Sequence, residues 1–253
     1  MDASAHLLPV GMAVAAGLVG CFALMRRMTL ASDALSHVAL PGIGVALLLQ
    51  VHPLVGGLAA LFLGVLLVWV IEYKTRLPTE TVIGVVFSAA LAVGSLLTSG
   101  EDLIDALFGA PGAAGPVETA LGFAGAAFVV AFLLRAKSRL VIALVSPDLA
   151  RTAGIHVARL QLLFLLAFSV SVALGLRYLG VLLMGSLVII PAATSRNLAR
   201  SLRSMLAIAV AAAVGATVIG SYAAGILGLE AGPLTIAVAA AGFFLSLLGR
   251  RRA

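Results

Sequence analysis

The sequence has little charge. Asp, Glu, Lys and Arg make up only 10% of its 253 residues, against about 25% in soluble globular proteins. Hydrophobic residues make up 62%, so the charged residues are too few to cover the surface of a soluble globule of this size. This composition excludes a disordered chain, a coiled coil and a secreted disulfide scaffold. It predicts an all-α protein that crosses a membrane several times.

Cysteine and lysine are also scarce. The single cysteine, Cys21, lies in an apolar run, so the chain can form neither an internal disulfide nor a thiolate metal cluster. Only Lys74 and Lys137 are lysines, and neither follows a glycine-rich loop of the Gly-x-x-x-x-Gly-Lys-Ser/Thr type. The sequence therefore predicts no nucleotide site in this chain. The start of the chain lacks the basic residues of a cleaved signal, so we expect its first apolar run to be retained.

Apolar runs of about 20 residues, the length of a membrane helix, recur along the chain. Only Arg177 and Tyr178 separate the sixth run from the seventh, so eight spans are an alternative to nine. The nine predicted spans are 7–25, 31–50, 54–71, 81–99, 117–134, 160–176, 179–195, 205–228 and 234–249.

The basic residues give these spans an orientation. With nine spans, all of the 16 basic residues except Arg177 fall on one side of the membrane. The positive-inside rule then places the N-terminus outside and the C-terminus in the cytoplasm. The net charge of +6 thus reflects membrane orientation, and we expect no nucleic-acid partner. The opposite gaps hold Asp2, Glu101, Asp102, Asp105, Glu118 and Glu230.

Polar residues interrupt the second predicted span. Asp33 and His37 are four residues apart and share a helix face, with the hydroxyl of Ser36 beside them. A charge at the bilayer centre costs about 2.5–3.5 kcal/mol, so such a residue usually faces other protein groups or a polar pathway. Two interpretations stay open from spacing alone: helix capping by Ser32 or Asp33 with a packed His37, or a cation site.

A proline follows this polar pair. Pro41 has no N–H, so the carbonyl of His37 loses its helical partner. Gly42 and Gly44 come just beyond, and we expect a broken turn there, of the kind that lines ion sites in membrane helices. Pro191 in span seven frees the carbonyl of Leu187 in the same way, which predicts either a kink beside the pore or ordinary packing.

An aspartate and a histidine together suit a divalent first-row metal, because imidazole and carboxylate are ligands of Zn, Mn and Fe(II). One of each is too few for a closed site, and a symmetric dimer would supply two of each. His6, His52 and the Glu101 to Asp105 cluster lie at the outer side, where they either meet an incoming cation or are ordinary surface groups. His156 lies in a cytoplasmic gap, and we predict no ligand role for it.

The longest cytoplasmic gap contains a complete short helix signal. Ser146 is a good cap, Pro147 suits the first helical position, Asp148 meets the positive helix end and Gly154 terminates the helix. Such a helix either rests on the lipid interface or docks on a partner. The spacing predicts that its apolar side chains form one outward face, made of Leu149, Ala150 and Ala153.

Three of these segments carry a resemblance to a known family. The residues from Ser32 to Gly42, from Ser146 to Gly154 and from Val181 to Arg196 resemble motifs of the manganese/zinc/iron-type permeases of ATP-binding cassette importers. Asp105 to Gly109 and Ala231 to Pro233 are weaker matches. The resemblance covers essentially the whole chain in the right order.

The resemblance implies a single transmembrane permease domain over residues 1–253, related in fold to the vitamin B12 and siderophore permeases. It also implies a bacterial plasma-membrane location and a complex of two permeases with two ATPase subunits, in which an external binding protein delivers the metal. No enzymatic activity or permanently bound cofactor is expected in this chain. The pore ligands of the family correspond to Asp33 and His37 here. Its coupling helix, which docks on the ATPase, falls on Ser146, Pro147, Asp148, Leu149, Ala150, Arg151 and Gly154.

Two other functions remain open at this point. A permease for a metal chelate or a B12-like ligand on the same fold would need a wide path without paired Asp and His ligands. An ion-coupled secondary carrier would need no ATPase and would usually contain inverted repeats and several buried carboxylates, whereas Asp33 is the one plausible buried carboxylate in this sequence.

Overall fold

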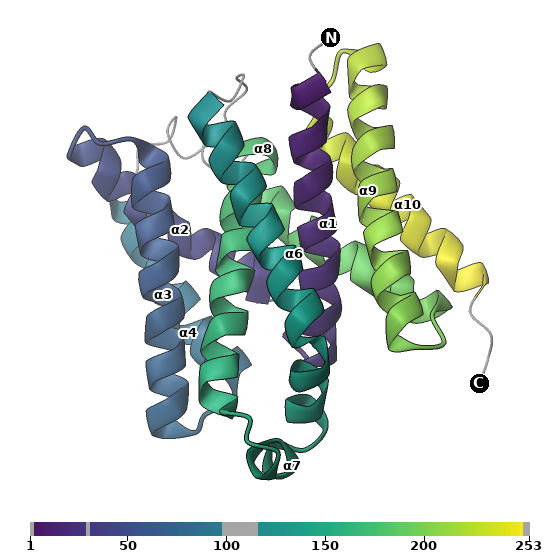
Figure 1. Ribbon diagram of the computed structural model, residues 1–253. Coiled ribbons are helices and arrows are strands. Elements are labelled where there is room, and N and C mark those ends of the chain that lie inside the picture. Colours follow the sequence, from purple (N-terminus) through teal and green to yellow (C-terminus); the bar gives the residue numbers. More distant parts are fainter. Residues whose placement is uncertain (1–2, 29–30, 98–115, 250–253) are drawn as a thin grey trace.

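The computed structural model describes residues 3–28, 31–97 and 116–249, and every regular element among them is a helix (Figure 1). The all-α prediction is therefore confirmed for this part of the chain. The helices are α1 (Ala3–Met25), α2 (Ala31–Leu48), α3 (Pro53–Thr75), α4 (Thr79–Leu97), α6 (Pro116–Val145), α7 (Pro147–Thr152), α8 (Val157–Leu198), α9 (Leu202–Leu227) and α10 (Ala231–Leu248).

Seven helical segments among the described residues are long and apolar enough to cross a bilayer. They lie in α1, α2, α3, α4, the first part of α8, α9 and α10, and they coincide with seven of the nine predicted spans. The predicted spans 117–134 and 179–195 are not among the seven. They lie within α6 and the second part of α8.

Helix α6 continues well past the end of its predicted span. It has 30 residues and carries Arg135, Lys137 and Arg139 in its second half. Basic residues stop a membrane span but not a helix, since Lys and Arg are good helix formers. Composition therefore predicts where the apolar part of α6 ends, at Leu134, but not where the helix itself ends.

Helix α8 is sharply bent. Its 42 residues would extend about 63 Å if straight, about twice the thickness of the hydrocarbon core. Yet the side chain of Met184 fills the space where a Cβ on Gly175 would lie, although nine residues span about 13.5 Å in a straight helix. The chain therefore turns between these two residues, where the sequence predicts a break at Arg177 and Tyr178, and the green ribbon in Figure 1 changes direction there.

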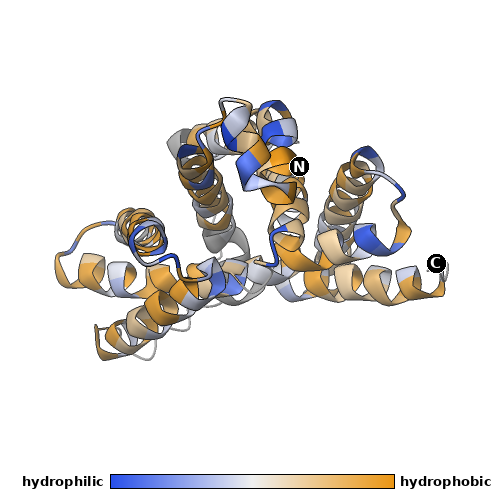
Figure 2. Ribbon diagram, turned by 90° about the horizontal axis from the view of Figure 1, so that it is seen from below, coloured by the Kyte–Doolittle hydropathy of each residue, from blue (hydrophilic) through white to orange (hydrophobic). Residues whose placement is uncertain are grey.

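Helix α2 lies among α3, α4 and α8, while α1 packs against α6, α8 and α9. Close packing of α2 on α3 depends on Gly42 and Gly56, because a Cβ on either glycine would overlap the carbonyl of the other. Small residues serve this purpose in membranes, where helices gain no hydrophobic drive to associate. Figure 2 shows that the helices are hydrophobic over most of their length and that hydrophilic residues gather near their ends.

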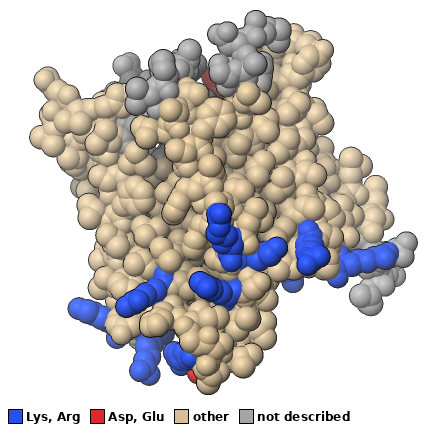
Figure 3. Space-filling model, in the orientation of Figure 1, with Lys and Arg blue, Asp and Glu red and all other residues tan. Residues whose placement is uncertain are grey.

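The basic residues gather on one side of the molecule. Figure 3 shows Lys and Arg over the lower half of the visible face, on the side where α7 projects in Figure 1. The side that carries α7 is thus the positively charged one on this face.

Candidate functional site

Asp33 and His37 lie one helical turn apart on α2. The helix begins at Ala31, so Asp33 lies in its first turn, where the positive end of the helix dipole stabilises a carboxylate. The capping interpretation also expects Asp33 to lie near the start of its helix. Both side chains are nevertheless half-buried within the helices rather than free at the surface, and their four-residue spacing directs them to the same face.

The backbone of α8 closes tightly over Asp33. A Cβ on Gly185 would lie 3.0 Å from the Cα of Asp33 and 3.1 Å from its Cβ. The buried hydroxyl of Ser32 donates to the Gly185 carbonyl at 3.4 Å. Ser36 donates to the backbone carbonyl of Asp33 at 2.7 Å. These contacts fix the first turn of α2 against the second part of α8.

The imidazole of His37 packs against an aromatic ring. The ring of Phe87, on α4, lies 5.5 Å from it between centroids, at an angle of 54°. The Nδ1 atom of His37 is buried and has no hydrogen-bond partner among the described residues. A buried polar atom left without a partner costs about 1–3 kcal/mol.

Helix α2 is not broken at Pro41. The helix continues from Ala31 to Leu48 through the proline, so the predicted broken turn is wrong. The lost hydrogen bond is a single one, and the contacts of α2 with α3, α4 and α8 hold the remaining turns in place. Gly42 serves close packing on Gly56 rather than unwinding of the helix.

The ligand count per chain is low. No group of three or more His, Cys, Asp and Glu side chains that could hold a metal occurs among the described residues. Asp33 and His37 thus remain two candidate ligands. Structural zinc sites, for comparison, have four ligands.

His52 and His156 lie apart from this pair. His52 is exposed at the start of α3. His156 is exposed at the beginning of α8, where it caps the helix without a side-chain hydrogen bond. The side chain of His6 and the cluster of Glu101, Asp102 and Asp105 lie outside the described residues.

The short helix α7 forms as its sequence predicts. The Ser146 hydroxyl accepts the N–H of Leu149 at 3.2 Å, and Pro147 occupies the first position. Arg151 and Asp148 form an ion pair at 2.9 Å. Gly154 ends the helix with a φ of 74°, a left-handed conformation that glycine adopts without strain. In Figure 1, α7 projects from the end of the molecule, between α6 and α8.

The predicted outward face of α7 is wrong in one residue. Ala150 is fully buried, whereas 59% of Leu149 is exposed and Ala153 is exposed as well. The Ala150 carbonyl also accepts the N–H of Ile155 at 2.9 Å. Because α7 makes less than two turns, its inner side rests on the fold through Ala150. Leu149 is the larger of the two apolar side chains that remain exposed.

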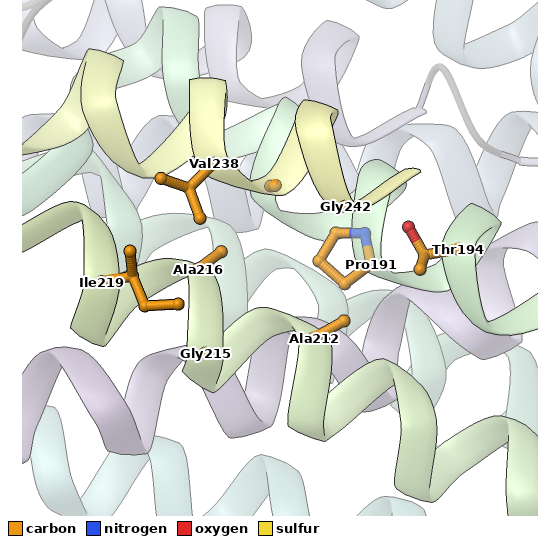
Figure 4. Close-up of a pocket in the computed structure, with 9 residues that line it drawn as sticks. Pro191, Thr194, Ala212, Gly215, Ala216, Ile219, Val238 and Gly242 are labelled. Atoms are coloured by element: carbon orange, nitrogen blue, oxygen red, sulfur yellow. The ribbon is translucent and has the colours of Figure 1, made fainter. Parts of the chain in front are cut away.

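A cavity of about 210 Å³ lies between α8, α9 and α10 (Figure 4). Its lining is small and apolar, with Ala212, Gly215 and Gly242 among its residues. Pro191 lines it too, in the second part of α8, which stays helical through the proline. No ionisable side chain lines this cavity, which separates it from Asp33 and His37.

Apolar helices of membrane length, a half-buried carboxylate and imidazole pair and a projecting helix on the basic side define an integral membrane permease. The model of the ABC 3 transport family matches residues 3–250. The chain belongs to this family.

Curated relatives cover nearly the whole chain. It is 30% identical to the high-affinity zinc uptake system membrane protein ZnuB of Haemophilus influenzae, over 92% of each chain. It is 27% identical to the manganese transport system membrane protein MntC of Listeria monocytogenes, over 94% of this chain and 87% of the relative. It is 28% identical to the manganese import system permease protein ScaB of Streptococcus gordonii, over 92% of this chain and 85% of the relative.

Two solved structures share the fold. The first is PsaBC from Streptococcus pneumoniae in complex with Fab, with a TM-score of 0.81, 26% identity and coverage of 96% of this chain and 89% of that one. The second is an inward-facing putative metal-chelate type ABC transporter, with a TM-score of 0.73 and 19% identity over 96% of this chain and 84% of that one. At that identity, the second likeness shows the fold alone.

Sequence reasoning did not find Phe87 or the specific role of Gly185. Phe87 sits in an apolar run with no local signal, so only the packing of α4 on α2 reveals it. Gly185 lies in the motif from Val181 to Arg196 that carries the family resemblance. A glycine followed by a serine in a membrane helix signals close approach of another helix, although not which residue approaches.

Proposed function

We propose that this chain is the permease subunit of an ATP-binding cassette importer for a divalent transition metal: zinc, manganese or iron(II). Family membership and the zinc and manganese systems in which the relatives act support this substrate class. The observation that carries the proposal is that Asp33 shares a helix face with His37, whose buried Nδ1 has no hydrogen-bond partner in the described part of the chain. The chain acts as one transmembrane domain over residues 1–253 in a bacterial plasma membrane, with its N-terminus outside and its C-terminus in the cytoplasm.

Asp33 and His37 bind the ion during passage. A carboxylate and an imidazole match zinc, manganese and iron(II) better than copper(I), which prefers thiolate and thioether ligands. Two copies of the chain provide two of each ligand, so the site is complete only in the homodimer. The ion is cargo, so the ligands must release it as well as bind it. A site assembled from two subunits can be opened by moving the subunits apart.

Helix α7 docks on a separate ATPase subunit. Its exposed Leu149 is an apolar anchor, and the side on which it projects carries the basic residues (Figure 3). The chain has no glycine-rich phosphate loop of its own, so a partner chain hydrolyses ATP and moves α7. An external binding protein delivers the ion at the opposite face.

The test is uptake by the complete complex. The permease is reconstituted into vesicles with its ATPase subunits, and the uptake of zinc, manganese and iron(II) is measured with ATP inside and the cognate binding protein outside. We expect ATP-dependent uptake of at least one ion, and its loss in Asp33→Ala. Uptake of a chelated metal that Asp33→Ala leaves unchanged would replace the proposal with a chelate permease. Uptake without ATPase subunits would instead indicate a secondary carrier.

A further inference from the structure

A polar cluster lies where four helices end or begin. It is separate from the ion pair of α7 and from the proposed metal ligands. Arg26 follows the last residue of α1, and its Cζ lies 4.6 Å from the ring centroid of Phe164 on α8. Arg26 is partly buried, and this burial lowers its pKa to about 10, against the opposing effect of Glu72 on α3. A guanidinium over an aromatic ring is held most strongly when both lose water.

Glu72 connects three helices through its two carboxylate oxygens. Its Oε1 accepts the hydroxyl of Thr79, the first residue of α4, at 2.8 Å. Its Oε2 accepts the side-chain amide of Gln161, in the second turn of α8, at 3.5 Å. Gln161 lies three residues before Phe164, the ring over which Arg26 lies. Contacts with neighbouring turns of α8 thus join the ends of α1, α3 and α4. Networks of this kind are sensitive to the loss of any member.

The same network reaches α7. The indole N–H of Trp69 on α3 donates to the carbonyl of Ala158, in the first turn of α8, at 2.9 Å. Only residues 153–156 separate that turn from α7, and the N–H of Ile155 donates to the Ala150 carbonyl at 2.9 Å. A displacement of α7 therefore acts on the first turns of α8, which Trp69 and Gln161 hold.

At its other end the network reaches α2. Arg26 begins a tight turn in which the buried Met28 donates its N–H to the Ala23 carbonyl at 2.8 Å. The N–H of Ala31 in turn donates to the Met28 carbonyl at 3.1 Å. Asp33 lies only seven residues after Arg26. The position of the Arg26 side chain against Phe164 thus constrains where α2 begins.

We infer that Arg26 and Glu72 are positioning residues for transport, which hold the α7-linked start of α8 in a fixed relation to the turn that leads into α2. Movement of α7 by the ATPase then shifts the turn of α2 from Asp33 to His37 (the α2 ligand turn) instead of deforming α8 locally. This inference rests on the proposed docking of α7. It adds a connection between α7 and the α2 ligand turn.

The test measures ions transported per ATP hydrolysed, in vesicles that contain the permease with its ATPase subunits and with manganese or zinc as the probe. Arg26→Met keeps the apolar stem and removes the charge, and Glu72→Gln keeps the shape and removes the charge. We expect ions per ATP to fall by about fivefold or more in each, the lower end of typical coupling between sites, while ATP hydrolysis continues.

Matched controls exist beside both residues. Arg27→Asn removes the same charge from an exposed neighbour, and its φ of 60° is one that asparagine tolerates. Glu80→Gln removes an exposed carboxylate from the first turn of α4. Both controls should keep the ratio of ions to ATP. The double variant Arg26→Met with Glu72→Gln should lose less than the sum of the two single variants, because both residues act on the same turns of α8; additive losses would overturn this shared role.

A milder variant guards against loss of folding. Trp69→Phe keeps an aromatic ring but removes the N–H that donates to Ala158, and we expect it to lower the ratio as well. An unchanged ratio in Arg26→Met and Trp69→Phe, or ATP hydrolysis and uptake that fall in proportion, would overturn the inference. Leu149→Glu in the same assay separates the two proposals. If Leu149→Glu leaves the ratio of ions to ATP unchanged, the proposed docking of α7 is wrong. If Leu149→Glu lowers the ratio and the variants of Arg26, Glu72 and Trp69 do not, only the positioning role is wrong.

Discussion

The α2 ligand turn and helix α7 are both short polar segments in an apolar chain, but they are stabilised in different ways. In α7 the cap, the ion pair and the terminal glycine all come from nine consecutive residues, 146–154. In the α2 ligand turn, the groups around Asp33 and His37 come from α4 and α8, and the Nδ1 atom of His37 has no partner among the residues that the structure describes. A segment that satisfies its own polar groups is suited to docking, whereas one that does not is suited to binding an ion.

The largest expected effect is at the α2 ligand turn. Asp33→Ala or His37→Ala should lower metal uptake by more than about 100-fold, since changes to groups behind the ligands already reduce metal affinity by about 10–100-fold. In a homodimer each substitution removes two ligands. Uptake is measured in vesicles, and co-purification of the ATPase subunits shows that assembly is intact. Normal uptake by both variants would return this turn to the capping interpretation.

The next effect tests α7 with two adjacent residues. Leu149→Glu puts a charge on the exposed side and should weaken ATPase binding by about 30-fold, equivalent to about 2 kcal/mol at an interface hot spot, with unchanged melting temperature. Ala150→Glu buries a charge and should instead lower the melting temperature by destabilising the fold by about 2 kcal/mol or more. Affinity measurements on the purified permease and thermal unfolding distinguish the two. A stable, coupled complex with Leu149→Glu would mean that α7 only rests on lipid.

A smaller effect is expected where α8 meets the α2 ligand turn. The Cβ of Gly185→Ala would lie 3.0–3.1 Å from Asp33 atoms, so one helix has to shift. Overpacking of this kind costs about 1–3 kcal/mol, and we expect uptake to fall by about fivefold. Gly215→Ala is the control, because a Cβ there meets nothing within 4 Å. Equal uptake by the two alanine variants would show that the distance between α8 and Asp33 does not matter.

The smallest effect is expected from cysteine substitutions that test the membrane orientation of the chain. These substitutions should leave transport unchanged. In a Cys21→Ser background, Arg27→Cys and Arg251→Cys should react with an impermeant thiol reagent only from the cytoplasmic side. Glu101→Cys should react only from outside. Labelling of positions 101 and 251 from the same side would contradict the orientation that places α7 next to the ATPase.

Periodicity and charge in the sequence were enough to predict most of the fold. Apolar runs predict seven of the spans, and the caps predict α7 residue by residue, because both depend on neighbours in the chain. Pro41 shows the limit: local rules predict a break, but the packing of α2 on three helices overrides it. The inward side of Ala150 and the length of α6 depend likewise on contacts that no local pattern contains.

For the candidate site, spacing predicts that Asp33 and His37 share a face, and the structure has them half-buried one turn apart. Their role as metal ligands stays a prediction. The neighbours of the pair could not be predicted, because Phe87 and Gly185 lie 50 or more residues away in the sequence. The network of Arg26 and Glu72 was hidden for the same reason, since each residue alone looks like an ordinary charge at the end of a membrane helix.

Trp69 has a practical consequence. It is the one tryptophan in the sequence, and its indole N–H is bonded to the first turn of α8 at 2.9 Å, with Tyr73 stacked beside it. The native permease therefore carries a built-in optical reporter at the junction between α3 and the first turn of α8. Its emission spectrum, recorded while nucleotide is added to the assembled complex, follows this junction through the transport cycle without any attached dye, and Trp69→Phe provides the blank.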